Sequence, residues 1–359
     1  MSAASFALFF IPIFMTMFSI QAPTAGARRL APAAALGLLL LASCAKDKDS
    51  AVATPAAPAV VTFTQAGLYP EGVQYDAANS RFLVTSLTTG RVGQVKDDGT
   101  YSPAFPDDPK LVSAIGLYLD EPRNRVLAAI SDPGANQARS TSATQNKLAR
   151  LAIFNRSAPT AAPTIVELGT LRPALGHFAN DVAVDAQGNA YVTDSFSNLI
   201  YKVDAVTNVA TVFLEDAARL GTPAAGAFGF NGIVVHPDGY LLVIKSDNGG
   251  LYKVPLSSPS TYTQVTTAQN LMAGDGLLLQ DNNTLQVVSN AQAKVFRLTT
   301  ANGFGAATLA GTFATKAEFP TTLARRDGAS YVLYANLDKL FGGQTPPVSQ
   351  YSINRVAFQ

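Results

Sequence analysis

The chain has 359 residues, of which 48% are hydrophobic and only 14% are charged. This composition disfavours intrinsic disorder, which requires low hydrophobicity and a high net charge. The 26 basic and 25 acidic side chains leave a net charge of +1, so nucleic acid is not expected as a partner. With two His and one Cys, the chain can form neither an internal disulfide nor a zinc site of four Cys or of two Cys and two His. Any metal is therefore expected to have mainly oxygen ligands.

The first 44 residues have the pattern of an export signal. Arg28 and Arg29 precede an apolar run over residues 30–41, which ends at small residues before Cys44. This order is typical of a secretory signal, and the run is shorter than the ~18 residues of a transmembrane helix. The Leu-Ala-Ser-Cys sequence at 41–44 resembles a bacterial lipobox. That resemblance implies a lipid anchor on Cys44 and a place in the cell envelope, facing the periplasm or the cell surface.

A second apolar stretch lies upstream, at residues 6–20, with no Lys or Arg before it. It is either an additional membrane segment or a sign that translation starts at Met15 or Met17, and we favour the later start because it leaves an ordinary lipoprotein signal. Residues 45–60 contain prolines and little that could form a core, so we expect a flexible tether there. The folded domain is then predicted at 61–359.

From residue 68 onward one pattern recurs: a polar residue, a small residue, an apolar strand, a turn and a second strand. Successive repeats start about 44, 65, 51, 44 and 46 residues apart, the range expected for four-stranded propeller blades. No helical periodicity alternates with the strands, which disfavours a parallel α/β sheet. The prediction is an all-β fold, a six-bladed β-propeller closed by strands at 60–65 and 348–358. The long second repeat is expected to hold an insertion loop near 135–163, with one strand near 148–151.

The first position of each repeat forms a column that we call the axial column. Its six members are Glu71, Ile115, Asn180, Asn231, Asp275 and Thr321. Equivalent positions of propeller blades lie at one height around the axis, so four carboxylate or carboxamide side chains should converge at the channel mouth. Such oxygen ligands suit a divalent cation such as Ca²⁺. Asn, Asp and Gly are also common turn formers, and the column could be explained by that preference alone.

The motifs carry a family resemblance. Residues 70–73 (Pro-Glu-Gly-Val), 180–185 (Asn-Asp-Val-Ala-Val-Asp), 231–233 (Asn-Gly-Ile) and 274–277 (Gly-Asp-Gly-Leu) resemble those of the gluconolactonase and regucalcin family of calcium-dependent lactonases. The resemblance spans about residues 65–358 and implies a six-bladed propeller with one divalent cation at the axis. The cation would be Ca²⁺, or another such as Mg²⁺ or Zn²⁺. The family's sugar-lactone members have an Arg where this chain has Phe178, which favours a less polar lactone or ester.

The same resemblance implies roles for individual residues. Glu71, Asn231 and Asp275 would bind the metal, and Asp275 would also act as general base. Asn180 would contact substrate or metal-bound water, while Asp181 is either a supporting residue or part of a turn. The implied activity is metal-assisted hydrolysis of a small-molecule lactone or ester.

Three further side chains have open roles. His177 lies three residues before Asn180 and could reach the channel mouth, where a His can act as acid or base. His236 lies in a His-Pro-Asp-Gly turn and is expected to be solvated, and Lys245 either lines the mouth or is solvated. Propellers host enzymes and binding proteins alike, so the alternative function is a non-enzymatic lipoprotein that binds a ligand or a protein partner. The sequence does not determine the oligomeric state.

Overall fold

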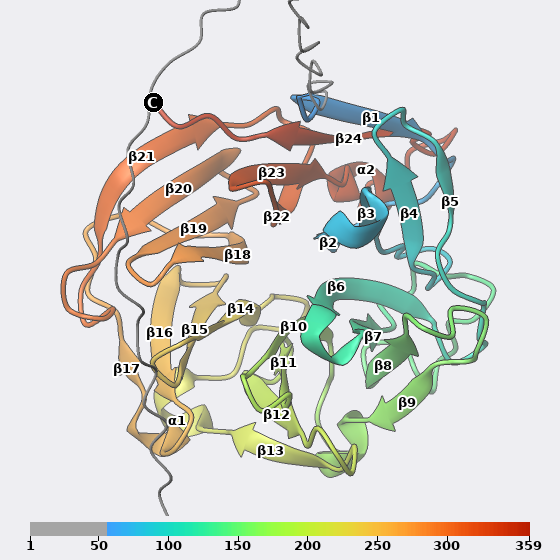
Figure 1. Ribbon diagram of the computed structural model, residues 1–359. Coiled ribbons are helices and arrows are strands. Elements are labelled where there is room, and N and C mark those ends of the chain that lie inside the picture. Colours follow the sequence, from blue (N-terminus) through green and yellow to red (C-terminus); the bar gives the residue numbers. More distant parts are fainter. Residues whose placement is uncertain (1–55) are drawn as a thin grey trace, which may run out of the picture. The chain divides into compact units, whose positions relative to one another are not determined.

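The computed structural model describes residues 56–359, in which six four-stranded antiparallel sheets surround a central axis (Figure 1). The predicted six-bladed β-propeller is therefore confirmed. The predicted export signal, Cys44 and most of the tether fall on residues 1–55, outside the described residues. Among the residues that are described, no helix is long and apolar enough to span a bilayer.

In each blade the first strand lies nearest the axis and the others follow outward (Figure 1). Blade one contains β2 (Val73–Asp76), β3 (Arg81–Val84), β4 (Gly93–Lys96) and β5 (Tyr101–Pro103). Blade two contains β6 (Ser113–Asp120), β7 (Arg125–Ser131), β8 (Ala149–Asn155) and β9 (Thr164–Glu167). Blade three contains β10 (Ala179–Val184), β11 (Ala190–Asp194), β12 (Leu199–Val203) and β13 (Ala210–Leu214).

The remaining blades follow the same order. Blade four contains β14 (Phe230–His236), β15 (Tyr240–Lys245), β16 (Gly250–Pro255) and β17 (Thr263–Gln264). Blade five contains β18 (Gly274–Asp281), β19 (Thr284–Ser289), β20 (Lys294–Thr299) and β21 (Thr308–Ala314). Blade six contains β22 (Pro320–Arg326), β23 (Ala329–Tyr334), β24 (Gln350–Arg355) and β1 (Val60–Thr64). Two short helices, α1 (Ala217–Leu220) and α2 (Leu337–Phe341), lie in connections.

Blade six joins the two ends of the folded chain. β1 is its outermost strand and pairs antiparallel with β24, with Val61 opposite Ile353. The predicted closing strands are thus paired with each other. In blade two, the strand predicted near 148–151 is present as part of β8 (Ala149–Asn155), and the connections at residues 132–148 and 156–163 lie on either side of it.

Apolar clusters fill the spaces between adjacent blades. One cluster joins Leu127 and Leu151 of blade two to Val182 and Tyr201 of blade three, and all four side chains are almost completely buried. The middle strands therefore have apolar neighbours on both faces, which explains continuous buried runs such as residues 240–245 of β15. These interfaces fix the positions of the inner strands around the axis.

Five of the six inner strands carry an irregularity at the axial column. In five blades the pairing of the first two strands shifts register around two residues: 115–116, 180–181, 231–232, 275–276 and 321–322. Bulges of this kind reorient side chains and are common next to functional sites. Here the first bulge residue is the axial-column residue of the repeat.

Glycine follows the column residue in four blades because the next blade is too close for a side chain. A Cβ on Gly232 would lie 2.3 Å from the carbonyl oxygen of Asp275, and one on Gly72 would lie 2.5 Å from that of Ile115. Hydroxyl groups bridge the same gaps. Thr85 Oγ1 accepts from the Gly72 amide (2.8 Å) and donates to the Ile115 carbonyl (2.7 Å).

We expect Gly232→Ala to lower the free energy of unfolding by about 2–3 kcal/mol, because its Cβ would overlap backbone atoms that cannot move aside. Urea denaturation measures the change. Gly176→Ala is the matched control, since its nearest neighbour would lie at an ordinary 3.4 Å. Equal stability of the two variants would contradict the close approach at the axis.

Candidate functional site

The four carboxylate and carboxamide residues of the axial column converge. Glu71, Asn180, Asn231 and Asp275 all line one cavity of about 330 Å³, and each is more than nine-tenths buried. Phenylalanines 178, 228, 319 and 341 line its walls, so we call it the aromatic cavity. The predicted convergence is therefore present in the structure. We call the four column side chains the polar floor of the cavity, and the phenylalanines form its apolar walls.

A fixed pairing orients the column side chains. In blades three, four and five the residue 15 positions later, just after the second strand, hydrogen-bonds the column residue. These pairs are Asn180 Nδ2 to Ser195 Oγ (2.9 Å), Asn231 Nδ2 to Ser246 Oγ (3.0 Å) and Asn290 Nδ2 to Asp275 Oδ2 (3.0 Å). These partners were not predicted from the sequence, although the constant spacing of 15 residues is a signal that could have identified them.

The serine hydroxyls determine which way the two carboxamides face. Ser195 Oγ donates its only proton to the carbonyl of Phe230 (2.5 Å), and Ser246 Oγ donates to the carbonyl of Gly274. Each hydroxyl can then only accept from its Asn, which turns the NH₂ group towards the serine and the Oδ1 atom away from it. Within residues 56–359, Asn180 Oδ1 and Glu71 Oε2 are buried without a hydrogen-bond partner. Buried oxygens of this kind are costly unless something binds them.

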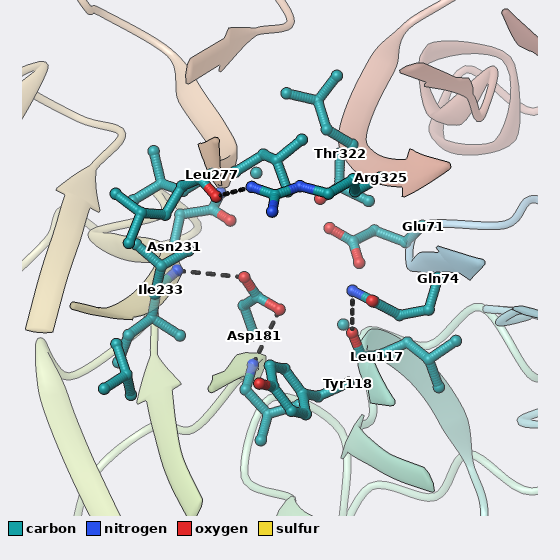
Figure 2. Close-up of a pocket in the computed structure, with 18 of the residues that line it drawn as sticks. Glu71, Gln74, Leu117, Tyr118, Asp181, Asn231, Ile233, Leu277, Thr322 and Arg325 are labelled. Atoms are coloured by element: carbon teal, nitrogen blue, oxygen red, sulfur yellow. Dashed lines mark hydrogen bonds between the residues drawn. The ribbon is translucent and has the colours of Figure 1, made fainter. Parts of the chain in front are cut away.

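A second cavity, of about 250 Å³, lies next to the aromatic cavity along the inner strands, and we call it the axial cavity. It is lined by residues that follow the bulges and shares Glu71 and Asn231 with the aromatic cavity. Figure 2 shows the Asp181 carboxylate pointing into it, between Ile233 and Gln74. Asp181 accepts from the backbone amides of Val182 (2.8 Å) and Ile233 (3.1 Å). It thus links blade three to blade four and lies beside the column.

The three acids share a strongly unfavourable environment for negative charge. Burial raises the pKa of Asp181 to about 7, against the effect of its two amide donors. Burial, with repulsion from Asp181, raises the pKa of Asp275 to about 7, although Asn290 and Asn231 oppose the shift. Burial and the charges of Asp275 and Asp181 raise the pKa of Glu71 well above its usual value. A bound cation would relieve all three effects.

These residues fit a hard divalent cation on two observations: the floor offers oxygen donors, and two of its buried oxygens are unpaired. In the described part of the chain, no three His, Cys, Asp or Glu side chains form a metal-binding group. A cation on the floor would therefore use carboxamide oxygens together with Glu71 and Asp275. This donor set suits Ca²⁺ better than Zn²⁺, which prefers nitrogen and sulfur.

His177 lies outside both cavities, so the prediction that it reaches the mouth is not met. Its ring is buried, with Nδ1 2.7 Å from Asp194 Oδ2 and Nε2 2.9 Å from the Arg172 carbonyl oxygen. Asp194 Oδ1 also accepts from the amide of Phe178 (2.9 Å). The pair therefore holds the chain that presents Phe178 to the aromatic cavity, and it does not contact the floor.

Two other sequence expectations were wrong because the structure buries the side chains. His236 is buried against Tyr240, with ring centroids 4.2 Å apart, and its Nε2 lies 2.8 Å from the Asn282 carbonyl oxygen. Lys245 neither lines a cavity nor is solvated: it is 4% exposed and forms an ion pair with Asp247. Asp247 itself lines the aromatic cavity, a position that was not predicted from the sequence.

No sequence profile of a known family and no curated protein matches the chain. Solved structures share its fold. The allergen Mala s 1 of Malassezia sympodialis superposes with a TM-score of 0.66 at 17% identity, over 84% of this chain and 96% of that one. A candidate gluconolactonase gives 0.56 at 15% identity, over 85% and 94%. Virginiamycin B lyase from Staphylococcus aureus gives 0.54 at 14%, over 76% and 80%. The resemblance to gluconolactonases is thus confirmed at the level of the fold.

We expect the metal-free protein to lose stability as pH rises from about 4 to about 7. In that window the folded state keeps protons on Asp181 and Asp275 that the unfolded state has released, so folding is favoured at the acid end. Urea denaturation in a chelator at pH 5 and pH 8 measures the difference. Asp181→Asn should reduce it, whereas Asp327→Asn, at an exposed position, should not. An unchanged difference in Asp181→Asn would contradict the raised pKa.

Proposed function

We propose that this protein is a hydrolase of apolar lactones or esters that uses a divalent cation, Ca²⁺ in the first place, on the floor of the aromatic cavity. The observation that carries the proposal is the serine-imposed orientation of Asn180 and Asn231 beside two carboxylates. This orientation turns the carboxamide oxygens away from the serines, in the same cavity that Glu71 and Asp275 line, and such oxygens suit a cation. Gluconolactonase-like proteins with the same fold support the reaction class by analogy.

Each of the four floor residues would then have a defined role in the hydrolysis. Glu71, Asn231 and Asp275 would hold the cation, which when bound polarises the carbonyl group of the substrate. Asn180 Oδ1 would accept a hydrogen bond from the attacking water and orient it. Asp275 would take a proton from that water, and the hydrogen bond from Asn290 would hold its carboxylate in position. Phe178 keeps the wall apolar and excludes bulk water from the floor.

The first test is a calorimetric titration of Ca²⁺ into the purified folded domain. We expect binding in the micromolar range or tighter for the natural sequence, and none for Asn231→Ala or Asp275→Ala, because each loses a ligand. Ser246→Ala keeps all ligands but frees the Asn231 carboxamide to turn, so its affinity should fall about 10- to 100-fold. Asp327→Asn is the control.

Turnover of γ-lactones and short-chain esters is measured on the same variants. Asp275→Asn should abolish hydrolysis while the protein stays folded by circular dichroism. Asp247→Asn tests whether the other carboxylate in the cavity is the base instead. Cation binding without turnover of any substrate would leave the alternative function, a propeller that binds a ligand or partner. Binding that ignores Asn231→Ala and Asp275→Ala would reject the metal site.

We further propose that the protein is held at a membrane of the cell envelope by a lipid on Cys44. Mass spectrometry of the native protein should find a mature chain that begins at a lipidated Cys44, and Cys44→Ser should release the protein from the membrane fraction. A mature chain that still carries residues 2–20 would contradict this proposal and the later translation start.

A further inference from the structure

The aromatic cavity adjoins another cavity. This neighbouring cavity, of about 510 Å³, shares Phe228 and Phe341 with the aromatic cavity, so the two meet at these residues, and we call it the side cavity. The side cavity is further lined by Phe196 and by the connection at residues 223–226. Nothing in the roles proposed above uses it.

A continuous aromatic wall joins the two cavities. The ring centroids of Phe178, Phe196 and Phe228 lie 5.0–5.5 Å from one another, which is contact distance for aromatic pairs. Phe178 belongs to the aromatic cavity, Phe196 to the side cavity and Phe228 to both. A ligand could therefore extend from one cavity into the other along an unbroken apolar surface.

Charge is confined to one end of this path. The charged residues that line the aromatic cavity are Glu71, Asp247 and Asp275, of which Glu71 and Asp275 belong to the floor. None of the residues that line the side cavity is charged. A ligand that fits the whole path is polar at one end and apolar over the rest of its length.

Two features of this apolar surface are energetically unfavourable in the protein without a ligand. Phe341 is 59% exposed, so the rim leaves a large aromatic side chain in contact with water. Phe319 adopts a left-handed backbone with φ of +54°, which is unfavourable for a bulky residue, and its side chain lines the aromatic cavity. Strained residues of this kind cluster at ligand-binding sites.

We propose that the substrate carries an aliphatic chain, which lies along the Phe178–Phe228–Phe196 wall and ends in the side cavity while its lactone or ester group rests on the floor. This inference rests on the proposed hydrolase function and specifies its substrate class. Chain binding and hydrolysis can be measured separately, so either can fail alone.

The first test compares kcat/KM for γ-butyrolactone, γ-octalactone and γ-decalactone with the Ca²⁺-loaded protein. We expect roughly a fourfold gain for each methylene that leaves water, until the side cavity is filled. Ala224→Asp puts a carboxylate at an exposed position of the side cavity and should lower the decalactone-to-butyrolactone ratio by about tenfold or more. Ala310→Asp, at an exposed position on the outer strand β21, should leave the ratio unchanged.

The second test needs no turnover. The chain contains no Trp, so Phe341→Trp makes a single reporter at the rim, and Leu309→Trp makes a control reporter on β21. Octanamide should shift the fluorescence emission of the Phe341→Trp protein to shorter wavelength and saturate, whereas acetamide should not. Neither amide should affect the emission of the Leu309→Trp protein.

The outcomes separate the two proposals. A saturable octanamide shift in a protein that hydrolyses no lactone would support the chain site and reject the hydrolase. Hydrolysis that is indifferent to chain length, together with no octanamide shift, would support the hydrolase and overturn the chain site.

Discussion

The close approach of six inner strands at one axis is the constraint on which the rest of this structure depends. Where Gly232 meets the carbonyl oxygen of Asp275, the next blade leaves no room for a side chain. The strands therefore bulge, and the bulge turns the preceding residue towards the space above the axis. Packing between blades, rather than any local preference, gathers Glu71, Asn180, Asn231 and Asp275 around one cavity. The polar floor is thus a consequence of how the propeller closes.

Closure of the propeller brings acidic side chains together at a buried site with little access to water. Three acids lie close together at the axis, and no Lys or Arg lines the aromatic cavity in the described part of the chain. The fold can meet this cost by holding protons on the carboxyl groups or by binding a cation. Arg325, which lines the axial cavity together with Glu71 and Asp181, adds a positive charge nearby. Proton binding and cation binding compete, so cation affinity and acidity at this site are linked. The hydroxyl groups of Ser195 and Ser246 favour the cation, because they turn carboxamide oxygens towards it.

The repeats made the fold and the floor predictable, because propeller blades place equivalent residues at one height. The axial column could therefore be predicted from the spacing of the repeats alone, although the second repeat is longer than the others. The burial of the two histidines was not predicted, since the spacing of the repeats does not encode it: His177 is buried by its contact with Asp194, and His236 by stacking against Tyr240, its partner across the β14–β15 hairpin. The side cavity was hidden for the same reason: Phe196, Phe228 and Phe341 come from three separate connections, which only the closed ring brings together.

The pairing of β1 with β24 determines when the propeller can close during folding. Val61 can pair with Ile353 only after the strands of all the other blades have been made, so blade six cannot be complete until β24 has been synthesised. Contacts this distant along the chain are slow to form, because a long loop must close first. Five blades can assemble early, but the ring that fixes Glu71 beside Asp275 stays open until the last strand arrives. A partly folded chain therefore has an unclosed axis, and the carboxyl groups of Asp275 and Glu71 acquire their raised pKa only in the final step of folding.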